Sequence, residues 1–370
     1  MILRRLAAIL FLPMMLAFGS GVYLYLGTLK SKVVKTRAEL PTVTKPRLVL
    51  PGTMFVVQDG RLFKLKDGGF TEIGVPGDWS QPTLTPDHTH LVAVLRGALS
   101  SDLYLLDLNG HIVKRLTNNA SKIVENNHWA FYPRVSPDGS TLFYSYDGPK
   151  HVDGAPGDDL SIWSMPLNGS QYQARHRTSP YWYTGGDVTP VPLAGSALLY
   201  VQHSIDPSTV VHSQIRLQSR PGDLVGKPLT NLADDCSEPA LSPDGTQLAM
   251  ICREGKQTAK LEVASFNGTA LGPARVLVEG ALFAAPAWSP DGQALAYFAP
   301  SGAAGHFELW WLAVPVVATP SPTATTTPSH APSAGGTASS VTVPSLPATP
   351  VPVQVTQGVD LTATSPPAWY

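Results

Sequence analysis

Hydrophobic and polar positions alternate over short distances along most of this chain, in the pattern typical of β-strands and tight turns. Three apolar runs, Leu142–Tyr146, Leu248–Cys252 and Leu295–Phe298, each follow a Ser-Pro-Asp-Gly string. Pro presets the first corner of a turn, Asp bonds nearby backbone amides, and Gly adopts positive φ. Each string therefore predicts a hairpin that joins two antiparallel strands.

The hairpin string repeats along the chain. It occurs at 135–146, 241–252 and 287–298, more loosely at 84–95, and as a degenerate copy with Ala194-Gly195 within 189–203. The Asp residues of the four clearer copies are separated by 51, 106 and 47 residues, so the degenerate copy lies in the double interval. A period of about 50 residues with several short strands per unit predicts the blades of a β-propeller.

Asn-Gly dipeptides form a second repeat, at 109–110, 168–169 and 267–268. Asn-Gly supplies the two positive-φ residues that a tight type I′ hairpin requires, so each dipeptide is predicted to join two antiparallel strands in such a turn. Each unit is then predicted to contain strand A, the Ser-Pro-Asp-Gly turn, strand B, a loop, strand C, the Asn-Gly turn and strand D. The sequence thus predicts an all-β propeller with six blades of four-stranded antiparallel sheets. Four units are complete, at 79–120, 129–180, 182–233 and 236–281. The partial unit at each end either forms its own blade or shares strands to close the ring.

The two ends of the chain differ from the repeats in composition. Residues 6–29 carry no charge and are long enough to cross a bilayer, so we expect 1–29 to be a transmembrane signal anchor. A cleaved signal peptide, followed by secretion, is the alternative. We expect a charged stalk at 30–51 and the propeller at 52–315. Residues 316–370 are rich in Thr, Pro, Ser and Ala and almost uncharged, which predicts a disordered low-complexity tail.

The distribution of charge along the sequence restricts the possible partners and bears on the side of the membrane where the propeller lies. The net charge of -1 provides no basic face, so a nucleic-acid partner is not expected. Positive residues are somewhat more frequent after the apolar segment than before it, which favours a cytoplasmic propeller. The tail and the two cysteines suit an extracytoplasmic location, and we expect a single-pass membrane protein with an extracytoplasmic, monomeric propeller.

The repeated string has a recognisable form, Pro-x-(Trp/Leu/Val)-Ser-Pro-Asp-Gly-x-x-Leu-(Ala/Phe)-(Tyr/Met). It is clearest at Pro286–Phe298, Pro239–Cys252 and Pro133–Tyr146. This pattern resembles the TolB-like β-propeller repeat, also known as the WD-like PD repeat. The resemblance implies a six-bladed propeller, and family members are often exported and scaffold protein contacts. The same repeat also precedes the hydrolase domain of prolyl-oligopeptidase-type peptidases.

The Asp and Gly residues of the strings are predicted to serve the turns and not a ligand, because turn chemistry alone accounts for them. These residues are Asp87, Asp138, Gly139, Asp244, Gly245, Asp291 and Gly292. Cys236 and Cys252 flank one such hairpin almost symmetrically, so they would lie nearly opposite each other in an antiparallel pair. A disulfide and two separate buried thiols both remain open.

Four long loops, at 121–133, 147–159, 175–187 and 203–212, are predicted to emerge on the face opposite the tight turns. Aromatic, His and Asp residues gather in them, and such loops on a rigid scaffold are where binding usually occurs. The candidate interaction residues are His128, Trp129, Tyr132, His151, Asp153, Asp158, Asp159, His176, Tyr181, Trp182, Tyr183, His203 and His212. The alternative is that the aromatic residues pack between blades and the polar ones are solvated.

Signals for enzymes and cofactors are absent from the sequence. There is no G-x-S-x-G elbow, no P-loop, no G-x-G-x-x-G and no H-E-x-x-H, and no metal-ligand spacing stands out. We therefore expect a membrane-anchored scaffold without a cofactor, which binds a protein or an envelope polymer. The alternative is a propeller hydrolase, glycan-processing or lactonase-like, with Asp and His residues at the mouth of the pore.

Overall fold

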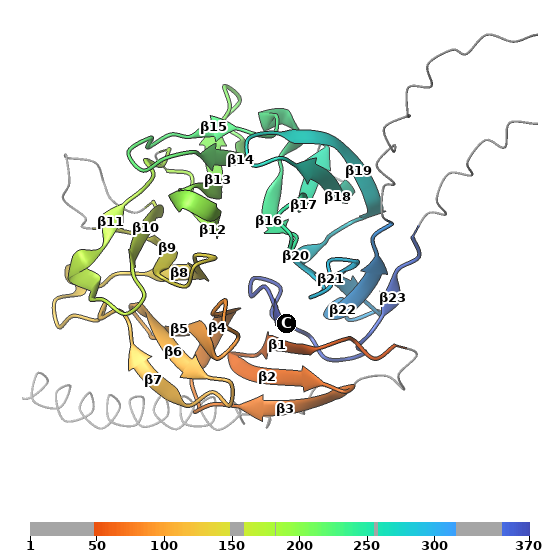
Figure 1. Ribbon diagram of the computed structural model, residues 1–370, viewed down its shortest axis with the longest axis horizontal. Helices are drawn as coiled ribbons and strands as arrows, with labels where there is room; N and C mark the ends of the chain where they lie inside the picture. The colour runs from red at the N-terminus through yellow and green to blue at the C-terminus, as the bar shows by residue number, and fades with distance from the viewer. Residues whose placement is uncertain (1–47, 149–158, 182, 255–257, 316–349) are drawn as a thin grey trace, which may run out of the picture. The chain divides into compact units, whose positions relative to one another are not determined.

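Six four-stranded sheets form a ring in the computed structural model (Figure 1). The structure describes residues 48–148, 159–181, 183–254, 258–315 and 350–370. Every neighbouring pair of strands within the sheets is antiparallel. The predicted six-bladed propeller is therefore confirmed.

The four strands of each blade follow one another from the axis of the ring to its outer edge. Blade 1 consists, from the innermost strand outward, of β24 (Ala368–Trp369), β1 (Thr53–Gln58), β2 (Arg61–Lys66) and β3 (Gly69–Ile73). Blade 2 consists of β4 (Asp78–Leu84), β5 (His90–Arg96), β6 (Ser101–Asp107) and β7 (Ile112–Arg115). Blade 3 consists of β8 (Ala130–Val135), β9 (Thr141–Tyr146), β10 (Ser161–Pro166) and β11 (Arg175–His176).

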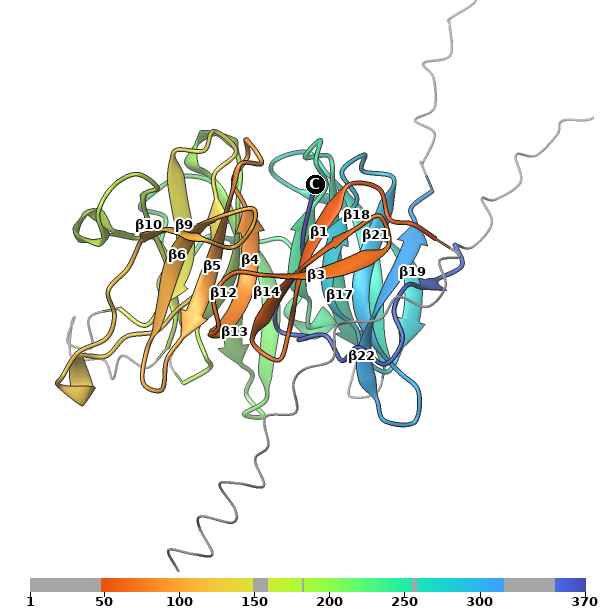
Figure 2. The ribbon, with the colours of Figure 1, turned by 90° about the horizontal axis from the view of Figure 1, so that it is seen from below.

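The other three blades have the same order. Blade 4 consists of β12 (Asp187–Pro192), β13 (Leu198–Ile205), β14 (Val211–Gln218) and β15 (Lys227–Pro228). Blade 5 consists of β16 (Ser237–Leu241), β17 (Gln247–Glu254), β18 (Thr258–Phe266) and β19 (Leu271–Gly280). Blade 6 consists of β20 (Ala284–Trp288), β21 (Ala294–Ser301), β22 (His306–Ala313) and β23 (Val353–Gln354). Figure 2 shows the strands running between the two faces of the ring.

Short 3-10 turns lie between some strands, at Val124–Asn126, Gln171–Gln173, Ala194–Ser196 and Leu232–Asp234. The Asn-Gly dipeptides at 109–110 and 267–268 join strands C and D as predicted, whereas the one at 168–169 leads into a 3-10 turn before β11. Gly110 and Gly268 have φ of 80° and 88°, but their asparagines do not have positive φ. These turns are therefore not of type I′, which needs positive φ at both residues.

The C-terminal segment completes two blades, so the prediction of a disordered tail over 316–370 is wrong for 350–370. β23 pairs with β22 as the outer strand of blade 6, and β24 pairs with β1 as the inner strand of blade 1. The two partial units of the sequence are thus separate blades, each completed from the C-terminal segment. Residues 316–349 lie outside the described residues, between β22 and β23 in the chain.

A buried polar contact holds the C-terminal segment on blade 6. The Thr356 hydroxyl accepts a hydrogen bond from the Leu309 amide at 2.8 Å and donates one to the Glu308 carboxylate at 2.6 Å. Glu308 also accepts a hydrogen bond from the Val359 amide at 3.0 Å. Glu308 and Thr356 are buried, so these bonds form away from water, where an unpaired group would be costly.

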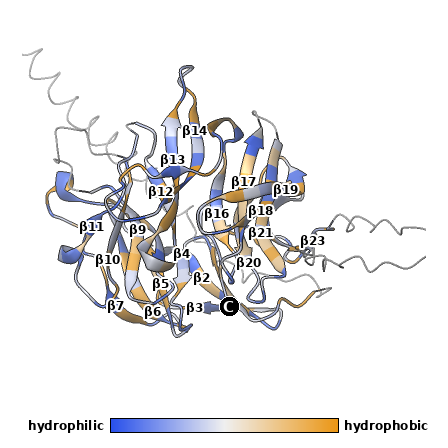
Figure 3. Ribbon diagram, turned by 45° about the horizontal axis from the view of Figure 1, so that its top comes forward, coloured by the Kyte–Doolittle hydropathy of each residue, from blue (hydrophilic) through white to orange (hydrophobic). Residues whose placement is uncertain are grey.

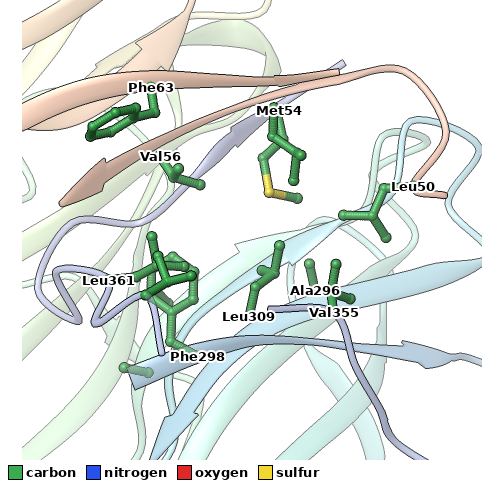
Figure 4. Packing of buried hydrophobic residues seen from close by; sticks show 13 residues of the cluster. Leu50, Met54, Val56, Phe63, Ala296, Phe298, Leu309, Val355 and Leu361 are labelled. Carbon is green, nitrogen blue, oxygen red and sulfur yellow. The ribbon is translucent and has the colours of Figure 1, made fainter. Parts of the chain in front are cut away.

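Hydrophobic side chains fill the spaces between neighbouring blades. Figure 3 shows hydrophobic residues mainly along the strands and hydrophilic residues mostly in the loops. The cluster that closes the ring joins β1 and β2, blade 6 and the C-terminal segment. It includes Met54, Phe298, Leu309, Val355 and Leu361, which Figure 4 shows packed together. Leu50 and Leu48 also belong to this cluster, so residues 48–51 are part of the propeller and not of the predicted stalk.

The contact between blades 3 and 4 is unusual because its hydrophobic cluster is small. The cluster contains Phe143, Ile162, Leu198 and Tyr200. Beside it, the buried Arg177 donates hydrogen bonds to the Ser196 carbonyl and the Gln218 side chain, both at 2.7 Å. Its guanidinium also stands 5.0 Å from the centre of the Phe143 ring. Polar contacts thus replace part of the apolar packing at this joint.

The structure joins Cys236 and Cys252 in a disulfide, with their Cα atoms 4.0 Å apart. Ser237 lies opposite Ile251 in the register of β16 and β17, which places the two cysteines opposite each other just before β16 and within β17. No helix among the described residues is long and apolar enough to cross a membrane. The predicted anchor at 1–29 lies outside the described residues, as does nearly all of the predicted stalk.

Candidate binding site in the central cup

A cavity of about 820 Å³ occupies the centre of the ring. Its wall consists of the inner strands β4, β8, β12, β16 and β20 and the segment before β24. Figure 1 shows these inner strands around the centre, with the C-terminal segment bending into it. Residues of the A–B turns, among them Pro137, Ala194 and Asp244, also line the cavity, so its mouth lies on the turn face. We call this cavity the central cup.

A bulge recurs in the inner strands that line the cup. In blades 2 to 6 a residue followed by proline interrupts the pairing with strand B. The five bulge residues have φ between 49° and 55°, and they are Gln81, Tyr132, Thr189, Glu238 and Ala285. Positive φ is uncommon outside glycine, and a bulge re-aims side chains in this way. By register, Pro366 takes this position in blade 1.

Bulge residues of adjacent blades are linked by hydrogen bonds. The Gln81 side-chain oxygen accepts from the Tyr132 amide at 2.6 Å, and the Glu238 carboxylate accepts from the Ala285 amide. Ser365 precedes Pro366, and its hydroxyl accepts a hydrogen bond of 2.7 Å from the Gln81 amide. The same bond between neighbouring blades is therefore made by an amide, a carboxylate and a hydroxyl oxygen.

Three side chains give the cup its chemistry. Arg134 lies two residues beyond the Tyr132 bulge, lines the wall and donates a hydrogen bond of 2.9 Å to the Pro133 carbonyl. It forms no ion pair with any residue that the structure describes. Burial lowers the pKa of Arg134 to about 10. The guanidinium stays charged at neutral pH, although burial makes its charge costly.

Glu238 lies on blade 5 and also lines the cup, with blade 4 between it and Arg134 of blade 3. Burial raises the pKa of Glu238 to about 7, although the Ala285 amide and the charge of Arg253 act in the opposite direction. The charges of both Glu238 and Arg134 shift the pKa of Tyr132. Burial has the largest effect and raises this pKa, the charge of Glu238 raises it further, and the charge of Arg134 lowers it. The cup is therefore mostly apolar, with one fixed positive charge and one carboxyl group that titrates near neutral pH.

The Asp residues of the three Ser-Pro-Asp-Gly strings, and Asp87 of the looser Thr-Pro-Asp-His copy, lie in the A–B turns and accept hydrogen bonds from residues of the same turn. In Asp138, for example, Oδ1 accepts from the Ser136 hydroxyl at 2.5 Å and from the Ser140 amide at 3.1 Å. Asp87, Asp244 and Asp291 make the corresponding bonds. Gly139, Gly245 and Gly292 have φ between 70° and 73°, as the turn requires. These side chains therefore perform the predicted turn chemistry.

The predicted interaction residues are not gathered into one site. His151, Asp153, Asp158 and Trp182 lie outside the described residues. Tyr132 lies in β8 and lines the cup, and His176 lies on the outermost strand β11, where its ring centre is 5.3 Å from that of Trp163. The other seven, His128, Trp129, Asp159, Tyr181, Tyr183, His203 and His212, lie in or beside the long loops.

Most of these loop residues already have partners within the propeller. His128 pairs with Asp147 at 3.0 Å, and His212 pairs with Asp206 at 3.2 Å. His203 bonds the Ser213 hydroxyl, and Trp129 stacks on Phe131 with their ring centres 5.9 Å apart.

Asp159, the remaining acidic residue of this set, accepts hydrogen bonds from the backbone amides of Tyr183, Thr184 and Gly185. Tyr181 and Tyr183 are 56% and 72% exposed, so they are the aromatic residues of this set that face water. Binding by this face stays a prediction.

Sequence reasoning missed Arg134 and Glu238, although the repeat contained a signal for them. Arg134 occupies the unspecified position after Pro in the repeat, where other blades carry Thr83, Ala240 or Ala287. Glu238 occupies the position before Pro, which varies from blade to blade. These two variable positions flank an invariant proline in an inner strand, and the side chains at such positions face the axis of a propeller.

No protein-family model matches this chain, and no curated protein matches it. Among solved structures, TolB from Acinetobacter baumannii is similar, with 18% identity, a TM-score of 0.54, and coverage of 72% of this chain and 62% of that one. The match thus spans less than two thirds of the TolB chain.

Two further structures are less similar. A protein described as TolB from Agrobacterium tumefaciens gives 18% identity, a TM-score of 0.45, and coverage of 70% and 83%. A gluconolactonase from Xanthomonas campestris gives 13% identity, a TM-score of 0.45, and coverage of 73% and 81%. The likeness concerns architecture alone: this chain has the fold of a TolB-like six-bladed β-propeller.

Proposed function

We propose that this chain is a binding scaffold whose central cup receives a protruding segment of a protein partner. The observation that carries the proposal is the cup itself. Its volume of about 820 Å³ lies within the range of about 300 to 1,000 Å³ that is usual for ligand sites. It combines a mostly apolar wall with a few convergent polar groups, which is the usual composition of such sites.

The lining favours a protein segment over an envelope polysaccharide. Nine prolines contribute to the wall, and Trp288, Trp369 and Phe266 add aromatic surface. Side chains and backbone of a peptide can bury apolar area against such a wall. A glycan would need many hydrogen-bond donors and acceptors for its hydroxyl groups, and this lining offers few.

An extracytoplasmic location is part of the proposal. The Cys236–Cys252 disulfide supports it, because disulfides persist in oxidising compartments. Membrane attachment through residues 1–29 rests on the apolar sequence alone. Protease treatment of intact and lysed cells distinguishes the two orientations, and digestion only after lysis would rule out an extracytoplasmic propeller.

A cup-blocking variant tests the binding site. Thr83 lines the cup at the same strand position as Arg134, so this position accommodates a large side chain in at least one blade. We expect Thr83→Trp to abolish capture of the partner in pull-down experiments from envelope extracts with the full chain as bait. Thr71→Trp, on the exposed outer strand β3, should leave capture unchanged. Equal capture by both variants would show that the partner binds elsewhere.

The hydrolase alternative has no specific observation in its favour. Among the described residues, no group of three or more His, Cys, Asp or Glu side chains lies close enough to hold a metal ion. The cup contains Glu238 and Asp244 as its acidic groups, and each is hydrogen-bonded within the propeller. We therefore propose a binding function only.

A further inference from the structure

Comparing the same strand position in different blades distinguishes residues that the fold requires from residues that it does not require. The wall position two residues beyond each bulge carries Thr83 in blade 2, Arg134 in blade 3, Val191 in blade 4, Ala240 in blade 5 and Ala287 in blade 6. Since small neutral residues hold this position in four blades, the propeller does not need a cation there. The guanidinium of Arg134 requires a different explanation.

The described surroundings of Arg134 leave that charge without a counter-ion. Its guanidinium donates a hydrogen bond to the adjacent Pro133 carbonyl, and Tyr132 is the one described neighbour that shifts its pKa apart from burial. A guanidinium presents five N–H donors in a planar fork, which matches a carboxylate. Desolvation of an unpaired charge is unfavourable, and a bound anion offsets it.

We propose that Arg134 binds a carboxylate group of the ligand in the cup, and that the charge of Glu238 weakens this binding when the side chain is ionised. The inference rests on the proposed binding function of the cup and specifies its ligand chemistry. The carboxylate is either a side chain of Asp or Glu or the C-terminal group of a protein partner.

Glu238 is suited to such control because its structural role does not need a charge. Gln81 makes the same bond to the next blade with a neutral amide oxygen. The ionised Glu238 places a negative charge in the cup, which opposes a second anion in a medium of low dielectric. The other titratable and charged groups that face Glu238 are Tyr132 on β8 and Arg253 on β17. Asp244 lies further out, at the mouth.

The expected pH dependence follows from these charges. Burial raises the pKa of Glu238 to about 7, so the side chain is neutral at pH 5.5 and ionised at pH 8.5. A peptide carboxylate, with an ordinary pKa of about 4, and Arg134 are charged at both pH values. Binding of an anionic ligand should therefore be tighter at pH 5.5, by about tenfold, which corresponds to one pKa unit of interaction.

The test uses the full chain and three N-acetylated tripeptides as probes, with dissociation constants measured by ligand-observed NMR at the two pH values. Acetyl-Ala-Glu-Ala-amide carries a side-chain carboxylate, acetyl-Ala-Ala-Ala carries a C-terminal one, and acetyl-Ala-Ala-Ala-amide is the neutral control. We expect one acidic probe to bind at least tenfold more tightly than the neutral probe, which also identifies the source of the carboxylate. Equal binding of all three probes would overturn the inference.

Two variants assign the effect to residues. Arg134→Ala should remove the preference for the acidic probe, and the alanines of blades 5 and 6 show that the position tolerates this residue. Arg175→Ala, on the exposed strand β11, is the matched control and should keep the preference. Glu238→Gln should bind the acidic probe at pH 8.5 as tightly as at pH 5.5. A preference that survives in Arg134→Ala, or an unchanged pH dependence in Glu238→Gln, would refute the assignment.

Failure of this inference can be told apart from failure of the binding function. If Thr83→Trp blocks capture of a protein partner while Arg134→Ala does not, the cup binds its partner without a carboxylate contact. If neither variant affects capture, the cup is not the binding site.

Discussion

Replacing Leu361 by alanine tests whether the C-terminal segment is part of the propeller. The Leu361 side chain is 2% exposed, and it packs with Phe298, Leu309 and Val355 in the cluster that closes the ring (Figure 4). Its amide donates a hydrogen bond of 2.8 Å to the Phe307 carbonyl. In a disordered tail the same leucine would contact solvent, and its replacement would have almost no effect on stability.

The cost of Leu361→Ala follows from this burial. The substitution removes three buried carbon atoms, each worth about 0.8 kcal/mol, and leaves a cavity between blade 6 and blade 1. We expect a loss of about 3 kcal/mol in the free energy of unfolding, within the range of about 2 to 5 kcal/mol measured for such core changes. The backbone hydrogen bond is retained, so the loss reports packing alone.

Equilibrium unfolding in urea, followed by tryptophan fluorescence, measures this effect. The matched control is Val351→Ala in the same segment, because Val351 is 76% exposed and its truncation should change stability by less than about 0.5 kcal/mol. If Leu361→Ala and Val351→Ala unfold at the same urea concentration as the parent chain, the segment does not pack on blade 6 and the described closure of the ring is wrong.

Three further predictions concern the joints between blades and the interior of one blade. Arg177→Ala should lower the free energy of unfolding by about 3 kcal/mol, because it leaves buried acceptors without their charged donor. Arg175→Ala, at an exposed position, should leave the free energy of unfolding unchanged. If both variants change it only slightly, the polar contact between blades 3 and 4 does not stabilise the propeller. The pKa of Glu238 is about 7 in the folded chain and about 4.5 in the unfolded chain. The contribution of this one side chain to stability is therefore greatest below pH 4.5 and falls as the pH rises to 7, by about 3 kcal/mol at most. Glu238→Gln should remove this part of the pH profile measured by thermal unfolding. Replacing Cys236 and Cys252 together by alanine should lower the free energy of unfolding by about 3 kcal/mol, the value expected for a disulfide that closes a loop of about 15 residues. An unchanged unfolding midpoint under oxidising conditions would contradict the disulfide.

Local chemistry explains which parts of this fold the sequence predicts well. A Ser-Pro-Asp-Gly turn forms from residues adjacent in the chain, as the bonds of Asp138 to Ser136 and Ser140 show. Because this unit recurs in three clear copies and one looser copy, the strand order within a blade and the four complete units follow from spacing alone. The same locality makes the cysteine pair visible, since both residues flank one hairpin.

The closure of the ring escapes prediction for the opposite reason. β24 pairs with β1 across more than 300 residues of chain, and no local signal marks such a partnership. The segment 350–370 also follows a long stretch rich in Thr, Pro and Ser, and it contains enough of these residues itself that composition does not separate the two. Its alternating Val353, Val355 and Val359 are too few to signal a strand without the rest of the blade.

The proposed binding site presents a third situation, in which the conserved part of the repeat does not point to the candidate residues. Residues that recur in several blades are noticed because they define the pattern, and in the structure they serve turns and interblade packing. Arg134 and Glu238 interrupt the pattern at positions where neighbouring blades carry neutral residues. In a propeller every blade places the same strand position against the common axis, so differences among blades at those positions determine the chemistry of the central cup. For a repeat protein considered alone, the departures from the repeat are therefore more informative about binding than the repeat itself, and in this chain they identify one cation and one titrating carboxyl group.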